Sequence, residues 1–193
     1  MTQMTLTAVL LTGGESRRMG RDKATIEING ETLWQRQLRV LRELKPQEIL
    51  ISARTRPNWL PADIELQLDD PPSRGPLSGL AKALAAMRTT HLITLAVDMP
   101  FMTGEELNRL CGLGRSGCGV VPMIGEQAEP LAAIYPVEAF PDFSKALTTA
   151  DSSLQPLIRA LATVGKVGLY EVPADGAHLY RSVNAPGDLE FDA

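Results

Sequence analysis

Apolar runs and amphipathic stretches alternate along most of the chain. Residues 91–97 (HLITLAV) are almost entirely apolar or β-branched, which is typical of a central strand covered on both faces. Shorter runs of this kind predict strands at residues 7–11, 48–53 and, more weakly, 65–68. Apolar positions at helical spacing predict helices at residues 32–44 and 76–87. A further short helix is predicted to begin after Thr103 and run to about Leu110, because Thr103 and Glu106 have the spacing of a capping box.

The second half of the chain is less regular but continues the alternation. It predicts strands at residues 119–123, 130–135 and 167–172, and helices at residues 137–147 and 153–164. Nearer the N-terminus, residues 24–28 are predicted to be a short strand closed by the turn pair Asn29-Gly30. No repeat or linker interrupts the sequence. We therefore expect residues 1–193 to form one three-layer, Rossmann-like α/β domain with a mostly parallel sheet.

Composition narrows the functional classes. The chain has 193 residues, of which 44% are hydrophobic and 22% charged, so a globular fold is expected. Its net charge of −4 argues against a nucleic-acid binder. The short N-terminal apolar run lacks a basic region before it, and no stretch approaches a membrane span, so we expect a cytoplasmic protein. Cys111 and Cys118 lack zinc-site spacing and are expected to be reduced thiols.

Chemistry-bearing residues gather in residues 11–23, LTGGESRRMGRDK, directly after the first predicted strand. Ligands of open α/β sheets bind beyond the carboxyl ends of the strands. Glycines let backbone N–H groups approach phosphate oxygens, while arginine and lysine supply positive charge. A cluster of basic residues in an acidic chain therefore predicts a polyphosphate site. Arg17 is not counted as a ligand, because adjacent arginines rarely both face one ligand.

Other phosphate-binding motifs fit this loop poorly. The dinucleotide fingerprint GxGxxG is absent, because Gly13 and Gly14 are adjacent and the next glycine is Gly20. The P-loop pattern fails as well, since the interval from Gly14 to Gly20 is one residue too long and Arg21 follows it. These failures argue against an NAD-linked oxidoreductase and a P-loop NTPase. A solvated basic surface loop remains the simplest alternative to a ligand site.

The loop pattern L-x-G-G-x-S-x-R-M-G-x-D-K resembles the signature of the MobA-like nucleotidyltransferases, which act on molybdopterin. Further matching motifs follow in order: GPLSG at 75–79, VDMPF at 97–101, EPLAAIY at 129–135 and VNAPGDL at 183–189. The resemblance implies a nucleotide-diphospho-sugar transferase-like fold and the guanylyltransferase activity of this family. That activity is the Mg²⁺-dependent transfer of GMP from GTP to molybdopterin, with release of pyrophosphate.

The resemblance also implies roles for individual residues. Arg18, Lys23 and Asp98 would be catalytic, Asp98 would bind Mg²⁺, and Asn184 would contact the molybdopterin substrate. The implied nucleotide-binding residues are Leu11, Thr12, Gly13, Gly14, Lys23, Ser52, Asp69 and Asp98. The register near GPLSG favours Asp69 but leaves Asp70 open. Thr12 stands where relatives commonly have alanine, and Ser52 where they often have asparagine, so the contacts of these two side chains are open as well.

Several alternatives remain at this point. A cytidylyltransferase for the same cofactor usually has L-A-A-G in this loop, so Gly13-Gly14 favours guanine. Sugar-phosphate nucleotidyltransferases share the fold but are usually longer. A non-catalytic nucleotide-binding protein is disfavoured by the presence of both Lys23 and Asp98. The expected partners are GTP and molybdopterin, with cofactor-donating and acceptor proteins implied by the resemblance, and the expected oligomeric state is a monomer.

Overall fold

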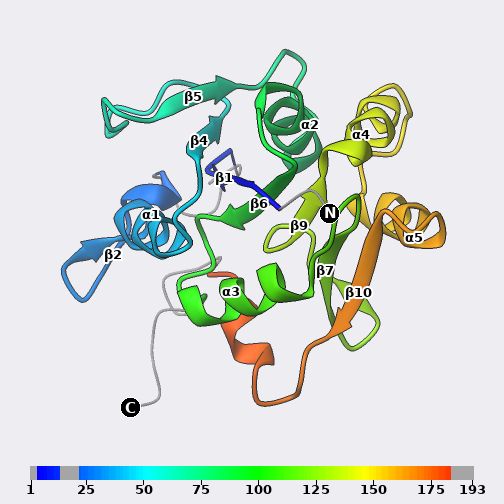
Figure 1. The fold of residues 1–193 in the computed structure, drawn as a ribbon. Helices are drawn as coiled ribbons and strands as arrows, with labels where there is room; N and C mark the ends of the chain where they lie inside the picture. Colours follow the sequence, from blue (N-terminus) through cyan, green and yellow to red (C-terminus); the bar gives the residue numbers. More distant parts are fainter. Residues whose placement is uncertain (1–3, 14–21, 184–193) are drawn as a thin grey trace.

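A twisted central sheet organises the molecule (Figure 1). The computed structural model describes residues 4–13 and 22–183, and the sheet has eight strands in this part of the chain. Their order is β10-β7-β9-β6-β1-β4-β5, and β8 pairs with β7 outside this path. The strands are β1 (Leu6–Leu11), β4 (Glu48–Ala53), β5 (Glu65–Leu68), β6 (His91–Ala96), β7 (Gly119–Ile124), β8 (Gln127–Ala128), β9 (Ile134–Pro136) and β10 (Val167–Glu171).

The parallel half of the sheet brings several strand ends to one edge. β1 pairs in parallel with both β4 and β6, and β4 pairs in parallel with β5. Leu11, the last residue of β1, lies opposite Ser52 on one side and Ala96 on the other. The carboxyl ends of these three strands are therefore level. β9 runs antiparallel to its neighbours β6 and β7, whereas β7 and β10 pair in parallel.

Helices cover both faces of the sheet (Figure 1). On one face lie α1 (Leu33–Glu43) and α3 (Gly104–Leu113); on the other lie α2 (Pro76–Ala86), α4 (Phe140–Ala146) and α5 (Leu154–Thr163). Alternate residues of β1 serve the two layers, since Ala8 and Leu10 belong to the core beneath α1 and α3 while Val9 and Leu11 pack beneath α2. The predicted three-layer α/β fold with a mostly parallel sheet is confirmed.

Three predicted elements differ from the observed ones. The prediction of a strand at residues 24–28 is wrong in its first half, because Asp22 caps a 3₁₀ turn, η1 (Lys23–Thr25), and only β2 (Glu27–Ile28) pairs with β3 (Glu31–Thr32). Residues 130–135 contain regular strand only from Ile134, because Pro130 and Leu131 form a turn, and β9 continues to Pro136. The helix predicted at 137–147 is divided into η2 (Val137–Ala139) and α4.

The helix predicted after Thr103 forms, but its capping box is only half present. The Thr103 hydroxyl accepts a hydrogen bond from the Glu106 backbone N–H at 3.2 Å. The Glu106 carboxylate does not reach back to Thr103; it accepts a hydrogen bond from the Tyr180 hydroxyl at 2.8 Å instead. Glu106 thereby ties α3 to the short turn η3 (Ala177–Tyr180).

Three further findings concern the helices, the two cysteines and His91. None of the described helices has the length and apolarity required to cross a membrane. Cys111 and Cys118 are both free thiols, as predicted, and burial raises the pKa of Cys111 to about 11. His91 is fully buried, and its ring nitrogens lie 2.9 Å from the Thr90 hydroxyl and 3.1 Å from the Arg115 carbonyl oxygen. Desolvation lowers the pKa of His91, so this side chain is a neutral part of the core.

Candidate active site

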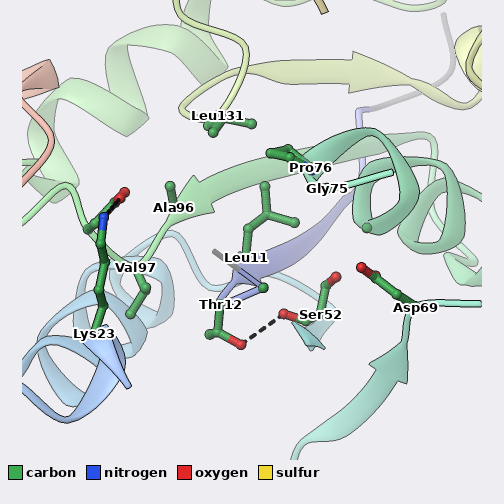
Figure 2. Close-up of a pocket in the computed structure, with 13 residues that line it drawn as sticks. Leu11, Thr12, Lys23, Ser52, Asp69, Gly75, Pro76, Ala96, Val97 and Leu131 are labelled. Atoms are coloured by element: carbon green, nitrogen blue, oxygen red, sulfur yellow. Dashed lines mark hydrogen bonds and ion pairs between the residues drawn. The ribbon is translucent and has the colours of Figure 1, made fainter. Parts of the chain in front are cut away.

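A pocket opens at the edge of the sheet where the parallel strands end (Figure 2). Its cavity volume is about 140 Å³. β1 and β6 contribute their last residues and those just beyond them, β4 contributes Ser52 one residue before its end, and the first turn of α2 closes one side. The lining residues are Leu11, Thr12, Gly13, Lys23, Ser52, Asp69, Gly75, Pro76, Gly79, Ala96, Val97, Asp98 and Leu131. The position agrees with the rule that open α/β sheets bind ligands beyond their strand ends.

Lys23 and Asp98 form an ion pair in this pocket. The Lys23 ammonium donates to Asp98 Oδ2 at 2.9 Å, although the two residues are 75 positions apart in the sequence. The side chains are only 13% and 23% exposed. Partial exclusion of water strengthens the interaction between such charges relative to a pair on the surface. Two of the three residues predicted to be catalytic therefore meet, one from the end of the glycine-rich loop and one from the turn after β6.

The turn that carries Asp98 is fixed through its backbone. The carbonyl oxygen of Asp98 accepts from the Val183 N–H at 2.8 Å, and that of Pro100 accepts from Arg36 Nε at 2.6 Å. Between them, the carbonyl oxygen of Met99 accepts from the side-chain amide of Gln37, which is fully buried. Three successive carbonyl groups are thus held by α1 and by the C-terminal segment. This arrangement restricts the directions in which the Asp98 carboxylate can point.

Asp69 and Asp70, the two candidates for a nucleotide contact, have side chains in different surroundings. Asp69 lines the pocket, and Figure 2 shows its carboxylate on the same side as Ser52. Its Oδ2 accepts from the Ser73 hydroxyl at 2.6 Å, whereas its Oδ1 is buried and has no hydrogen-bond partner among the described residues. Asp70 is instead 87% exposed and pairs with Lys82 at 2.7 Å. A buried acceptor without a donor costs free energy, so Asp69 Oδ1 is suited to a ligand that supplies an N–H group.

Thr12 and Ser52, the two positions that depart from the family pattern, contact each other. The backbone N–H and the hydroxyl of Thr12 both donate to the Ser52 carbonyl oxygen, each at 2.9 Å (Figure 2). The larger side chain at residue 12 is therefore directed toward β4. Ser52 is 3% exposed and lines the pocket. A serine hydroxyl can both donate and accept a hydrogen bond there.

The two glycines of the GPLSG motif, Gly75 and Gly79, are favoured at their positions for different structural reasons. A β-carbon on Gly79 would overlap the Ser52 hydroxyl and lie 3.2 Å from Leu11 Cδ2, so the absence of a side chain lets α2 approach β1 and β4. Gly75 has no such close contact, because no atom of the described residues lies within 4 Å of its β-carbon position. Gly75 has φ 64° and ψ −140° just before α2, a backbone conformation that glycine adopts without strain.

The structure brings most of the predicted site residues together. Seven of them line the pocket: Leu11, Thr12, Gly13, Lys23, Ser52, Asp69 and Asp98. Gly14, Arg18 and Asn184 lie outside the described residues, so their predicted roles stay predictions. The sequence reasoning assigned no role to Leu131 or to Gln37. The EPLAAIY motif could have drawn attention to Leu131, whereas no local pattern marks Gln37 as the residue that holds the Asp98 turn.

Glu129 is a further carboxylate near the site, in addition to Asp69 and Asp98, and the sequence reasoning assigned it no role. Burial, together with a smaller contribution from the negative charge of Asp98, raises its pKa to about 7, while a hydrogen bond from the Leu131 N–H at 3.2 Å acts in the opposite direction. The loop behind it is anchored, since the buried Tyr135 hydroxyl donates to the Pro130 carbonyl oxygen at 2.9 Å. Glu129 therefore adds a titratable group on the Asp98 side of the site.

Glu129→Gln is expected to stabilise the fold at pH 8 but not at pH 4.5. The pKa of Glu129 is about 7 in the folded chain against an ordinary 4.5, so between these pH values the folded chain binds more protons than the unfolded chain. The stability of the wild-type protein therefore falls as the pH rises from about 4.5 to about 7. Glutamine removes the buried charge, and the gain in the free energy of unfolding should reach roughly 3 kcal/mol above pH 7, at about 1.4 kcal/mol per pKa unit. Urea unfolding of both proteins from pH 4.5 to 8 measures it. A gain that is the same at every pH would contradict the expectation.

Comparison with known proteins agrees with this geometry. Residues 8–164 match the family model of the MobA-like NTP transferase domain. The chain belongs to this family. The matched segment contains every pocket-lining residue and extends from β1 to the end of α5. As a MobA-like NTP transferase, the chain is a nucleotidyltransferase.

Individual relatives match over nearly the whole chain. A protein of Opitutus terrae named "Probable molybdenum cofactor guanylyltransferase" is 37% identical over 191 residues, which cover 96% of this chain and 93% of the relative. The molybdenum cofactor guanylyltransferase of Cereibacter sphaeroides is 31% identical over 195 residues and covers 96% and 94%. The crystal structure of molybdopterin-guanine dinucleotide biosynthesis protein A from Archaeoglobus fulgidus superposes with a TM-score of 0.75 at 23% identity, covering 95% and 94%. This last similarity supports the fold.

The two ends of the pocket carry side chains of different chemical character. One end holds the charged pair Lys23 and Asp98, and the other holds the polar pair Ser52 and Asp69. Leu11 lies between them, as Figure 2 shows. A charged end suits phosphates and a metal ion, whereas a polar end with a buried, unpartnered acceptor suits the edge of a base. The arrangement thus fits a nucleoside triphosphate lying across the ends of β4, β1 and β6.

Proposed function

We propose that this chain transfers GMP from GTP to the terminal phosphate of molybdopterin, with Mg²⁺ bound at Asp98 and pyrophosphate as the second product. The observation that carries the proposal is the division of the pocket into the Lys23–Asp98 pair at 2.9 Å and the Asp69 carboxylate with its buried, unpartnered Oδ1. The names of the Opitutus terrae and Cereibacter sphaeroides relatives support guanine and the molybdenum cofactor as the substrates.

The residues at the charged end fit a magnesium ion. Asp98 offers carboxylate oxygens, which Mg²⁺ prefers, and only its Oδ2 is engaged by Lys23. Among the described residues there is no cluster of three or more His, Cys, Asp or Glu side chains that could enclose a metal. Mg²⁺ commonly binds through one or two carboxylates together with substrate phosphates. When bound, the ion would neutralise charge on the triphosphate and polarise the α-phosphate.

The chain itself would act by positioning and by charge stabilisation. Gly13 would leave room for the nucleotide at the end of β1, where its β-carbon position has no atom closer than 3.7 Å. Lys23 would shift from Asp98 toward the phosphates and stabilise the charge that develops on the leaving pyrophosphate. A phosphate nucleophile needs no strong base near neutral pH. Gly14 and Arg18, for which the family resemblance implies further phosphate contacts, lie outside the described residues.

Base selectivity would come from the other end of the pocket. Guanine presents adjacent N–H donors on its Watson–Crick edge, and Asp69 Oδ1 is an acceptor to which no group in residues 4–13 or 22–183 donates. Cytosine has a single exocyclic amino donor, so a cytidylyltransferase would satisfy this carboxylate less completely. Ser52 supplies a hydroxyl beside Asp69 that can contact the base or the ribose.

Thermal unfolding with GTP, CTP, ATP and UTP, each with Mg²⁺, tests the nucleotide. A ligand at about a hundred times its dissociation constant stabilises the fold by about 2.7 kcal/mol. For a chain of this length, we expect GTP to raise the Tm by roughly 5–10 °C and the other three nucleotides to have smaller effects. Asp69→Asn should remove most of the GTP shift, because it directs an amide toward the N–H donors of guanine.

Asp70→Asn is the matched control, since it changes the neighbouring carboxylate that lies outside this pocket and pairs with Lys82. It should leave the GTP shift intact. Equal shifts for all four nucleotides would overturn the guanine assignment, and a larger shift with CTP would favour the cytidylyltransferase. Transfer itself is measured as pyrophosphate released from GTP when molybdopterin is added, with no release expected from either substrate alone.

A further inference from the structure

The segment that carries Lys23 is held at its start by a contact that the family motif does not explain. Asp22 precedes Lys23 and uses both of its carboxylate oxygens. Oδ1 accepts from the Ala24 backbone N–H at 3.0 Å, which caps η1. Oδ2 accepts from the indole N–H of Trp59 at 2.9 Å. Trp59 belongs to the connection between β4 and β5, so this hydrogen bond joins parts of the chain 37 residues apart.

The Trp59 ring is itself held in place. It stacks on the ring of Trp34 with 5.0 Å between the ring centroids and 13° between the planes. Trp34 lies in the first turn of α1, whose Leu33 N–H donates to the Ile26 carbonyl oxygen at 2.8 Å. Both rings are half-buried against the core beneath α1. Stacking of this kind fixes the orientation of an aromatic ring, and thereby the direction of its N–H group.

We infer that Trp59 is a positioning residue for Lys23, acting through Asp22. The Trp59–Asp22 hydrogen bond fixes the residue just before Lys23, and the capped turn η1 then sets the direction in which the Lys23 side chain leaves the backbone. At the far end of this side chain, the ammonium meets Asp98 at 2.9 Å. A lysine has four rotatable side-chain bonds, so a fixed backbone origin reduces the volume that its charge explores. The activity part of this inference rests on the proposed function.

Trp59→Phe is the variant that tests the contact, because phenylalanine keeps a ring to stack on Trp34 but has no N–H to donate. Trp34→Phe is the matched control, since it alters the same stack and leaves the Trp59–Asp22 hydrogen bond in place. The first readout needs no substrate. Lysines are reductively methylated with ¹³C-formaldehyde, and the Lys23 resonance is assigned by its loss in Lys23→Arg. Asp98→Asn then marks the position of this resonance when the ion pair is broken.

The Lys23 resonance should move toward its Asp98→Asn position in Trp59→Phe and stay near the wild-type position in Trp34→Phe. With GTP and molybdopterin, kcat/KM for GTP should fall about three- to tenfold in Trp59→Phe and less than twofold in Trp34→Phe, with the KM for molybdopterin unchanged. A resonance that stays in place in Trp59→Phe, or moves equally in both variants, would overturn the inference. Absence of transfer by the wild-type protein would instead count against the proposed function, while the resonance would still decide the role of Trp59.

Asp22→Asn provides an independent variant in case Trp59→Phe fails to fold. Asparagine caps a helical turn as well as aspartate does, but its single oxygen cannot serve Ala24 and Trp59 together. It should therefore move the Lys23 resonance in the same direction as Trp59→Phe. Trp59→Phe added to Asp22→Asn should cause little further movement, because both changes remove the same contact. Full additivity of the two shifts would show that Trp59 does not act through Asp22.

Discussion

Asp98→Asn and Lys23→Ala are each expected to reduce nucleotidyl transfer to background, with a loss of about a thousandfold or more in kcat. The asparagine side chain has the size of aspartate but no charge, so it is a poor ligand for Mg²⁺ and no counter-charge for Lys23. Removal of the lysine takes away a positive charge on a side chain that is only 13% exposed and lies at the charged end of the pocket. Pyrophosphate release from GTP in the presence of molybdopterin measures both effects.

The Lys82–Asp70 pair offers a matched control for this experiment. It is also a lysine–aspartate ion pair, at 2.7 Å, but its side chains are 32% and 87% exposed and it lies outside the active-site pocket. Lys82→Ala and Asp70→Asn should each change turnover less than twofold. The double variant of Lys23 and Asp98 should be little worse than either single one, because groups that act together in one transition state lose their effect together. Turnover within tenfold of wild type in either single variant would refute the mechanism.

The candidate site was predictable where its residues follow strand ends. Asp98 comes directly after the most apolar run of the chain. Leu11 ends another such run, and Thr12 and Gly13 follow it, so the rule for open α/β sheets places these residues at one edge. The level ends of β1, β4 and β6 then bring Ser52 into the same pocket. Local sequence is sufficient for these residues because each strand ends within a few positions of the side chain concerned.

Residues that act through distant contacts were not predictable in this way. Gln37 lies on an amphipathic helix as an ordinary polar position, yet it is fully buried and its side-chain amide donates to the Met99 carbonyl oxygen. Trp59 lies in an irregular connection, and its hydrogen bond to Asp22 depends on how that connection folds over α1. The strand predicted at residues 24–28 was wrong in its first half for the same reason. Asp22 caps η1, and this turn takes the place of the first part of the strand. Tertiary hydrogen bonds decided each of these cases.

Gly119 is a further residue whose role depends on a contact with a distant part of the sequence. Of the single substitutions considered, Gly119→Ala is expected to cause the largest loss of stability. A β-carbon at this buried position in β7 would overlap the Ile134 carbonyl oxygen, and it would lie 2.7 Å from the Ile134 carbonyl carbon and 3.0 Å from Tyr135 Cα. All three atoms are backbone of β9, so no side-chain rotation can relieve the clash. We expect unfolding to become easier by about 3–5 kcal/mol, which for a chain of this length lowers the Tm by roughly 10–15 °C.

Gly168→Ala isolates the cause of this loss. Gly168 lies on the neighbouring strand β10, paired with Val120, and a β-carbon there would meet only the Gly119 carbonyl oxygen, at 3.9 Å. Alanine at residue 168 should leave the Tm unchanged or raise it slightly, because it reduces the conformational freedom of the unfolded chain. Differential scanning calorimetry of the two variants compares them directly. Similar Tm values would mean that β9 can move away from β7 at little cost. Because β9 also pairs with β6, whose end leads into Asp98, a shifted β9 should additionally lower GTP-dependent stabilisation in Gly119→Ala.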